Sequence, residues 1–92
     1  MSWSGILWNV DVRLTPEAAD EAAELPRTIK PRIFEIVDRL RRWPNVSGAK
    51  ALKGPFSGQW RIRTGDYRVQ FVVGHGQIMI VKVGHRDKFY ER

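Results

Sequence analysis

The sequence predicts an α+β fold in which one strand, two helices and a three-stranded meander follow each other in the order β-α-α-β-β-β. Residues 8–14 and 59–83 alternate apolar and polar side chains, whereas 16–43 space apolar side chains as a helix does. With 92 residues, 42% of them hydrophobic, the chain suffices for one core. We therefore expect a single domain, 1–92, whose antiparallel-rich, twisted sheet carries a helical hairpin on one face.

The first strand and the first helix are indicated by alternation followed by a helix-start signal. Every second residue of the strand is apolar: Trp8, Val10, Val12 and Leu14. Thr15 can cap free backbone N–H groups, and Pro16 suits the first helical position. Pro26 should end this alanine-rich helix.

The second helix is predicted between Thr28, a candidate cap, and Pro44, which should end it. Apolar residues at helical spacing define its buried stripe: Ile29, Ile33, Ile36, Val37, Leu40 and Trp43. The short connection to the first helix predicts an antiparallel hairpin. Residues 44–58 should form a long irregular loop.

The meander is expected to comprise strands at about 59–64, 67–73 and 77–83, the last two in central positions because they are strongly apolar. Gly65-Asp66 can form a two-residue turn, which sets Arg63 opposite Arg68. Like charges opposite each other destabilise a sheet. The pair therefore suggests a site for an anion, of which nucleic acid is the commonest polymeric kind in a cell.

The register of the second hairpin leaves two alternatives. A three-residue loop, 74–76, would set Lys82 opposite Arg68 on the arginine face, with Arg86 two steps further. A two-residue loop, His75-Gly76, would turn Lys82 toward the helices, where burying a charge is unfavourable. We prefer the first register for that reason.

Charge is distributed unevenly along the chain. The net charge is +6, but residues 1–24 carry five acidic residues against one arginine, and 25–92 carry fifteen basic residues against five acidic ones. This asymmetry favours a polyanion or an acidic protein as partner. No cysteine, membrane-spanning apolar run or signal peptide is present, so we expect a cytoplasmic protein without disulfides or membrane contact.

The candidate site residues fit phosphate chemistry. Arg61, Arg63 and Arg68 can each offer two charge-assisted hydrogen bonds to a phosphate. His85 is a candidate proton-transfer group, and Tyr90 can stack on a base or donate a proton. Because RNA carries its own nucleophile, the 2′-OH, such residues can cleave it by in-line attack. No metal-ligand spacing, carboxylate pair or phosphate loop occurs, so we expect neither cofactor nor metal.

The chain resembles the RelE/ParE superfamily of toxins from toxin–antitoxin modules. The segments that carry the resemblance are LKG at 52–54, GQWRIR at 58–63, GDYRV at 65–69 and VGHR at 83–86. The resemblance implies a RelE-like microbial RNase fold and, in the RelE branch, an endonuclease that cuts mRNA in the ribosomal A site and is inhibited by an antitoxin. Some members carry lysines where Arg61 and Arg63 stand, and arginine is a poor base.

Carried over residue by residue, the resemblance assigns the active site to matching positions: Arg61, Arg63, Arg68, Arg86 and Tyr90. Lys50 and Lys53 would help to hold RNA. Our leading hypothesis is a metal-independent mRNA endoribonuclease in which Arg63, Arg68 and Arg86 stabilise the scissile phosphate. In this hypothesis Arg61 positions the RNA, His85 acts as base, and Tyr90 acts as acid or stacks.

Two alternatives remain from the sequence. A ParE-like toxin would inhibit DNA gyrase without cleaving RNA, and an inactive relative would only bind its antitoxin. The expected partners are thus a cognate acidic antitoxin together with mRNA and the ribosome, or gyrase in the first alternative. The branches share a fold, and fold alone does not decide function.

Overall fold

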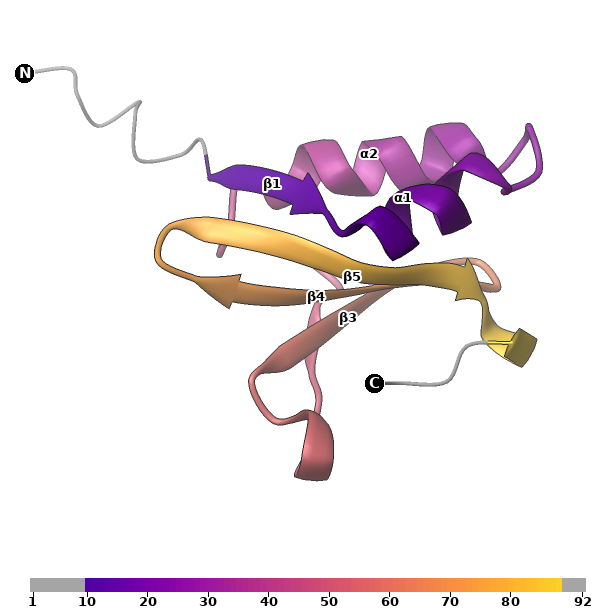
Figure 1. Cartoon of the computed structure of the whole chain (residues 1–92). Coiled ribbons are helices and arrows are strands. Elements are labelled where there is room, and N and C mark those ends of the chain that lie inside the picture. The colour runs from indigo at the N-terminus through magenta and orange to yellow at the C-terminus, as the bar shows by residue number, and fades with distance from the viewer. Residues whose placement is uncertain (1–9, 89–92) are drawn as a thin grey trace, which may run out of the picture.

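The computed structural model describes residues 10–88 and confirms the α+β class (Figure 1). Its elements are β1 (Asp11–Leu14), α1 (Pro16–Ala23), α2 (Lys30–Leu40), β2 (Lys50–Ala51), η2 (Gly54–Phe56), β3 (Gln59–Thr64), β4 (Tyr67–Gly74), β5 (Gln77–His85) and η3 (Arg86–Lys88), where η denotes a 3-10 helix. The sheet order is β1-β5-β4-β3-β2. β1 runs parallel to β5, and the other neighbours are antiparallel.

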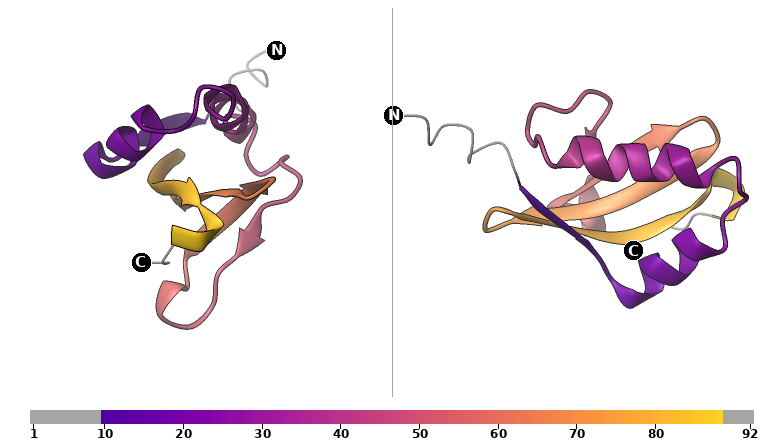
Figure 2. Two further views of the ribbon diagram at one scale, coloured as in Figure 1. Left: turned by 90° about the vertical axis from the view of Figure 1, so that its right-hand side faces the viewer. Right: turned by 90° about the horizontal axis from the view of Figure 1, so that it is seen from above.

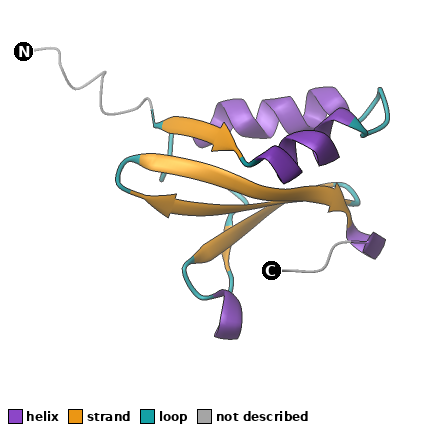
Figure 3. Cartoon of the chain, viewed as in Figure 1, coloured by secondary structure: helices purple, strands orange, loops and turns teal. Residues whose placement is uncertain are grey.

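The two helices cover one face of the sheet, as predicted (Figures 2 and 3). α2 buries Ile33, Ile36 and Leu40 against the sheet, and α1 contributes Ala18. The sheet's contribution to this core is Ile62, Val69, Phe71, Ile78, Ile80 and Val83. The other sheet face carries no helix, and we call it the open face. No helix within 10–88 is long and apolar enough to cross a membrane.

The helix starts show one correct and one wrong prediction. Thr15 caps α1 as expected, since its Oγ1 accepts a hydrogen bond from the Ala18 amide at 3.1 Å. The prediction that Thr28 caps α2 is wrong, because the cap position is Ile29 and no side chain caps it. The chain enters α2 through a backbone turn instead, in which the Ile29 amide donates to the Pro26 carbonyl at 2.9 Å.

The loop predicted over residues 44–58 contains a short strand that alternation could not reveal. β2 is only two residues long and pairs Lys50 with Arg61 and Ala51 with Trp60. The amide of Leu52 then donates to the carbonyl of Gln59 at 2.9 Å, which continues the pairing by one residue. A two-residue strand is too short for a period of two to be read from the sequence.

The first hairpin has the predicted register. Arg63 lies opposite Arg68 across β3 and β4, and Gly65 in the turn has a positive φ of 59°. Ile62 is 1% exposed and lies in the core, so the alternating arginines of β3 lie on the open face.

The preferred register of the second hairpin is wrong. Gly74 pairs with Gln77, so the turn is His75-Gly76, and both residues have positive φ, 53° and 71°. Arg68 accordingly lies opposite Gly84 and not Lys82.

A β-bulge nevertheless keeps Lys82 on the open face. The pairing shifts between Phe71↔Ile80 and Gln70↔Lys82, which leaves Val81 as an extra residue in β5. Beyond the bulge Val83 lies in the core, so Lys82 lies on the side of Gln70, which pairs with Arg61. The expected face of Lys82 is therefore correct, although a bulge and not a longer loop produces it.

α1 completes the edge of β5 beyond the end of β1. β1 pairs only with residues 77–80 of β5. Further along, Glu21 of α1 accepts a hydrogen bond from the Val83 amide on Oε1 at 2.9 Å. Its Oε2 lies 3.6 Å from the Nζ of Lys82, whose side chain is 6% exposed. One carboxylate thus satisfies a strand-edge donor and neutralises a buried amine.

Replacing Glu21 should therefore destabilise the fold. We expect Glu21→Ala to lower the free energy of unfolding by about 1–3 kcal/mol, since the Val83 amide loses its acceptor. Glu21→Gln should cost less, because it keeps an oxygen for that amide. Urea unfolding followed by tryptophan fluorescence measures both. Asp20→Ala, an exposed neighbour on the same helix, is the control and should change stability by less than about 0.5 kcal/mol. Equal losses for Glu21→Ala and Asp20→Ala would contradict the contact's role.

Candidate functional site

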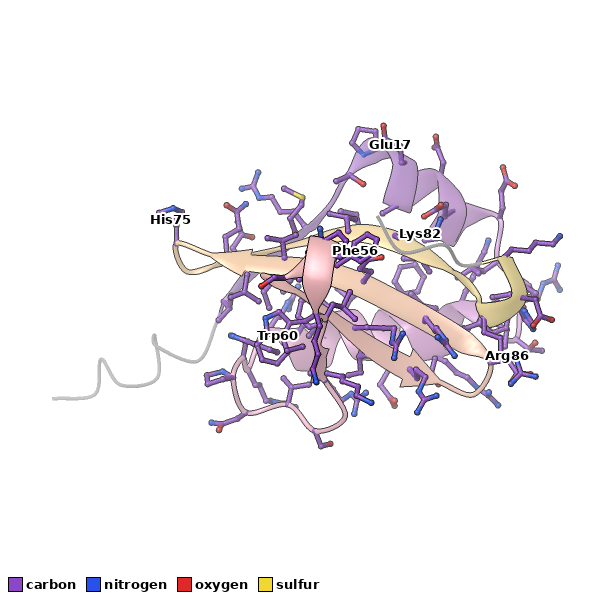
Figure 4. The ribbon with its side chains drawn as sticks, turned by 90° about the horizontal axis from the view of Figure 1, so that it is seen from below. Glu17, Phe56, Trp60, His75, Lys82 and Arg86 are labelled. Atoms are coloured by element: carbon purple, nitrogen blue, oxygen red, sulfur yellow. The ribbon has the colours of Figure 1, made fainter. Side chains whose placement is uncertain are left out.

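Cations gather on the open face in two cross-strand rows. The first row consists of Arg63, Arg68 and Gly84, and the second of Lys50, Arg61, Gln70 and Lys82. Residues directly opposite each other in a sheet share a face, so each row lies on the same side of the molecule. Figure 4 shows this face from below, with Lys82 toward α1 and Arg86 at the far end of the sheet. The strands therefore bring together basic side chains that are up to 32 residues apart in sequence.

Arg63 and Arg68 form the centre of the first row. They are direct cross-strand partners, and within residues 10–88 neither guanidinium has an ion-pair partner. The Nε of Arg68 is buried and makes no hydrogen bond to the described residues. A buried donor without a partner carries a desolvation cost, which an anion would relieve by accepting from it. These two residues make the best-defined candidate anion site of the sheet.

The second row contains basic side chains and the buried amide of Gln70. Arg61 is half-buried, and Lys50 lies opposite it on the short edge strand β2. Gln70 is fully buried, and its Nε2 donates to Oε1 of Gln59. Lys53 is exposed and directly precedes η2, in the arm that extends below the sheet in Figure 1. Lys50 and Arg61 therefore adjoin the Arg63–Arg68 pair, whereas Lys53 lies outside the rows.

Arg86 is held against the β3–β4 turn. Its amide donates to the carbonyl of Asp66 at 2.7 Å, and its Nε lies 3.8 Å from Oδ1 of Asp66 and 3.5 Å from Oδ1 of Asp87. Asp66 lies in the turn that joins the strands of Arg63 and Arg68. The structure thus anchors Arg86 at the end of the sheet where the arginine pair lies.

His85 is not brought together with the arginines. It pairs with Tyr67, and their rings make an edge-on contact with centroids 5.1 Å apart. Tyr67 alternates with Arg68, so the pair lies on the face opposite to the first row. The Nδ1 of His85 lies 3.1 Å from the Asp87 amide and 3.5 Å from its Oδ2. The backbone donor is nearer and its hydrogen is fixed, so Nδ1 is an acceptor. Tyr90 lies outside the described residues.

Two features of the site could not be found from the sequence, and a third was predicted with the wrong partner. Lys82 was expected on this face opposite Arg68, but the bulge sets it opposite Gln70 in the second row. The Gln59–Gln70 amide contact depends on the β3–β4 register. Arg32 of α2 reaches the β3–β4 turn from the helix side, since its Nη1 lies 3.5 Å from where a Cβ on Gly65 would stand. In the described part of the chain no three His, Cys, Asp or Glu side chains cluster as metal ligands would.

Comparisons with known proteins give one consistent relationship. Residues 12–90 match the family model described as ParE toxin of the type II toxin–antitoxin system parDE. No protein of curated function matches significantly. The fold is similar to the RelBE2 toxin–antitoxin complex from Mycobacterium tuberculosis, at 28% identity and a TM-score of 0.75 over 85% of this chain and 92% of that one.

Two further solved structures share the architecture. The archaeal RelE–RelB complex from Pyrococcus horikoshii aligns at 26% identity and a TM-score of 0.73, covering 88% of this chain and 99% of that one. The isolated Escherichia coli RelE toxin aligns at 16% identity and a TM-score of 0.70, covering 83% of each chain. At that identity the Escherichia coli protein supports the fold alone.

The opposed arginines should reduce stability. Arg63→Gln should raise the free energy of unfolding by up to about 1 kcal/mol at low salt, because it removes one of two facing like charges. The gain should shrink as salt screens the repulsion. Urea unfolding at two salt concentrations measures it. Arg13→Gln is the control, because Arg13 already pairs with Asp11, with Nε 2.8 Å from Oδ2. A low-salt loss of stability in Arg63→Gln would show that the pair does not repel.

Proposed function

The chain belongs to the ParE toxin family of type II toxin–antitoxin systems, matched over residues 12–90, and we propose that this toxin is a metal-independent endoribonuclease that cleaves mRNA in the ribosomal A site. The observation that carries the proposal is the pairing of Arg63 with Arg68, with Arg61 in the adjacent row of the same face. Like charges in direct opposition lower stability, and a polyanionic ligand accounts for their presence.

The arginines would act on the charge that develops during cleavage. In the proposed step the 2′-OH loses its proton to solvent water and forms a bond to the adjacent phosphorus, while the bond from phosphorus to the 5′ oxygen breaks and that oxygen takes a proton from Tyr90 or from water. Negative charge builds up on the non-bridging oxygens during this exchange. Arg63 and Arg68 would donate to these oxygens, and preorganised donors of this kind are often the largest catalytic contribution. Arg61 and Lys50, in the next row, would hold the neighbouring phosphate, and Lys53 would contact RNA from the arm. Arg86 would add charge from the turn end of the sheet.

Proton transfer does not fall to His85 in this proposal. The Nδ1 of His85 is engaged by the backbone amide of Asp87, 3.1 Å away, and does not face the arginines. The ring also lies on the face away from the arginine pair. We therefore assign the rate enhancement to charge stabilisation and in-line orientation by the arginines, with Tyr90 retained as a candidate acid or stacking residue.

The proposed protein partner is an antitoxin. The Mycobacterium tuberculosis and Pyrococcus horikoshii structures to which the chain is similar are toxin–antitoxin complexes. An acidic antitoxin would complement the charge of residues 25–92, which carry fifteen basic and five acidic residues. Covering the two cationic rows would exclude RNA from them.

A second candidate function is inhibition of DNA gyrase without cleavage. Two observations favour it. The matching family model is that of a ParE toxin, and the described residues of the two rows are cations, amides and glycine, with no proton acceptor for a 2′-OH. This candidate shares the fold and the basic face but predicts no cut RNA.

Primer extension on mRNA translated in vitro with purified toxin separates the candidates. We expect cuts in codon register, reduced about 100-fold in Arg63→Ala, the loss typical of removing one charge-stabilising donor. His85→Ala should change the rate by less than about threefold, against the 100-fold or more that loss of a general base would cause. Arg27→Ala, an exposed arginine between the helices, is the matched control and should cleave normally.

Two results would contradict this proposal. If the mRNA stays intact and the toxin inhibits supercoiling by purified gyrase, the nuclease proposal is wrong and gyrase inhibition is supported instead. A large loss in His85→Ala, with folding preserved by circular dichroism, would return the proton-transfer role to the histidine.

A further inference from the structure

A third row on the open face is apolar instead of charged. It consists of Leu52, Gln59, Val72 and Met79. Gln59 pairs with Val72, and Val72 pairs with Met79. Leu52 joins them because its amide donates to the Gln59 carbonyl and it alternates with Ala51 along the edge strand. Two residues of strand, about 7 Å, separate this row from the cations of the second row.

The row is separate from the hydrophobic core. Leu52, Val72 and Met79 are half-buried, and none of them belongs to the buried cluster beneath the helices or to the side chains packed against it. Phe56 on η2 is half-buried and is likewise outside the core. Figures 1 and 4 place η2 on the open side of the sheet, with Phe56 labelled in front of the strands. The open face is thus divided into a cationic half and a half-exposed apolar half.

Gln59 places an amide within the apolar row. Its Oε1 accepts from Nε2 of the fully buried Gln70 in the adjacent second row, so the side chain of Gln59 is held from the side. The contact engages the oxygen of Gln59, and its amide nitrogen makes no hydrogen bond to the described residues. A held amide amid apolar side chains is suited to a flat ligand that carries hydrogen-bond acceptors on its edge.

We propose that the third row is a nucleobase-binding subsite. With RNA phosphates on the two cationic rows, a base of the same strand would lie against Leu52, Val72 and Met79. The amide nitrogen of Gln59 would donate to a carbonyl oxygen or ring nitrogen on the edge of that base. Adjacent cationic and apolar surfaces complement the charged backbone and flat base of single-stranded RNA, a combination an apolar peptide lacks. The inference rests on the proposed function, because it requires RNA on this face, and it adds a residue that selects the base.

Binding of four labelled homopolymeric ribooligonucleotides, followed by fluorescence anisotropy, tests the subsite. Gln59→Glu keeps an oxygen for Gln70 but replaces the donor nitrogen by an acceptor. The matched control Gln77→Glu adds the same charge to the same face, one row further along β5. Both variants should weaken binding to all four oligonucleotides, whereas only Gln59→Glu should change the ratio between the tightest and the weakest, by about fivefold.

A second variant tests the apolar contact without disturbing Gln70. Leu52→Ser should weaken binding of a base-containing oligonucleotide and leave binding of an abasic ribose-phosphate oligomer unchanged. Circular dichroism should show that each variant is folded.

The outcomes separate the two proposals. RNA binding with equal affinity for all four bases, or an unchanged ratio in Gln59→Glu, would overturn the subsite and leave the nuclease standing. In that case the apolar row would be a surface for a protein partner. A wild-type protein that binds none of the oligonucleotides would overturn the subsite and the proposed function together.

Discussion

One extra residue in β5 determines which side chains the sheet presents to its two faces. Val81 occupies no place in the pairing between β4 and β5, so the alternation of β5 changes phase there. Before it, Ile78 and Ile80 lie in the core; after it, Val83 does. Without the bulge, Lys82 would enter the core and Val83 would leave it, because a slip of one residue exchanges the faces. The core and the cationic rows therefore depend on the same local irregularity.

The sheet contains one stabilising charge arrangement, around Glu21, and one destabilising arrangement, the Arg63–Arg68 pair. At the edge of β5 a single carboxylate, that of Glu21, meets both a backbone donor and a buried amine. Beside the β3–β4 turn Arg63 and Arg68 face each other with no carboxylate between them in the described part of the chain. The buried charge of Lys82 is neutralised, whereas the charges of the exposed Arg63 and the half-buried Arg68 are not. This is the distribution expected of a surface that binds an anion.

Strong periodic signals in the sequence predicted the fold. The features that were not predicted depend on local backbone irregularities, which leave no such signal. The alternation in β3 and the Gly65-Asp66 turn fixed the Arg63–Arg68 pair in advance, because a two-residue turn allows one register. The predicted register of the second hairpin was wrong because Gly74, which we expected in the loop, pairs with Gln77. The bulge in β5 could not be predicted, because it leaves no periodic signal in the sequence. The same limit applies to His85: its face depends on that phase change, so its proximity to the arginines could not be judged from spacing.

The hydrogen bond from the Arg86 amide to the Asp66 carbonyl also limits how the β3–β4 hairpin can vary. Hairpin tips are ordinarily places where extra residues are accommodated, because little else touches them. Here the tip is a docking point for a segment twenty positions away in the chain. An insertion at this tip would move the carbonyl and release the start of η3, whereas the His75-Gly76 tip, where no such contact is made by the described residues, would accommodate one.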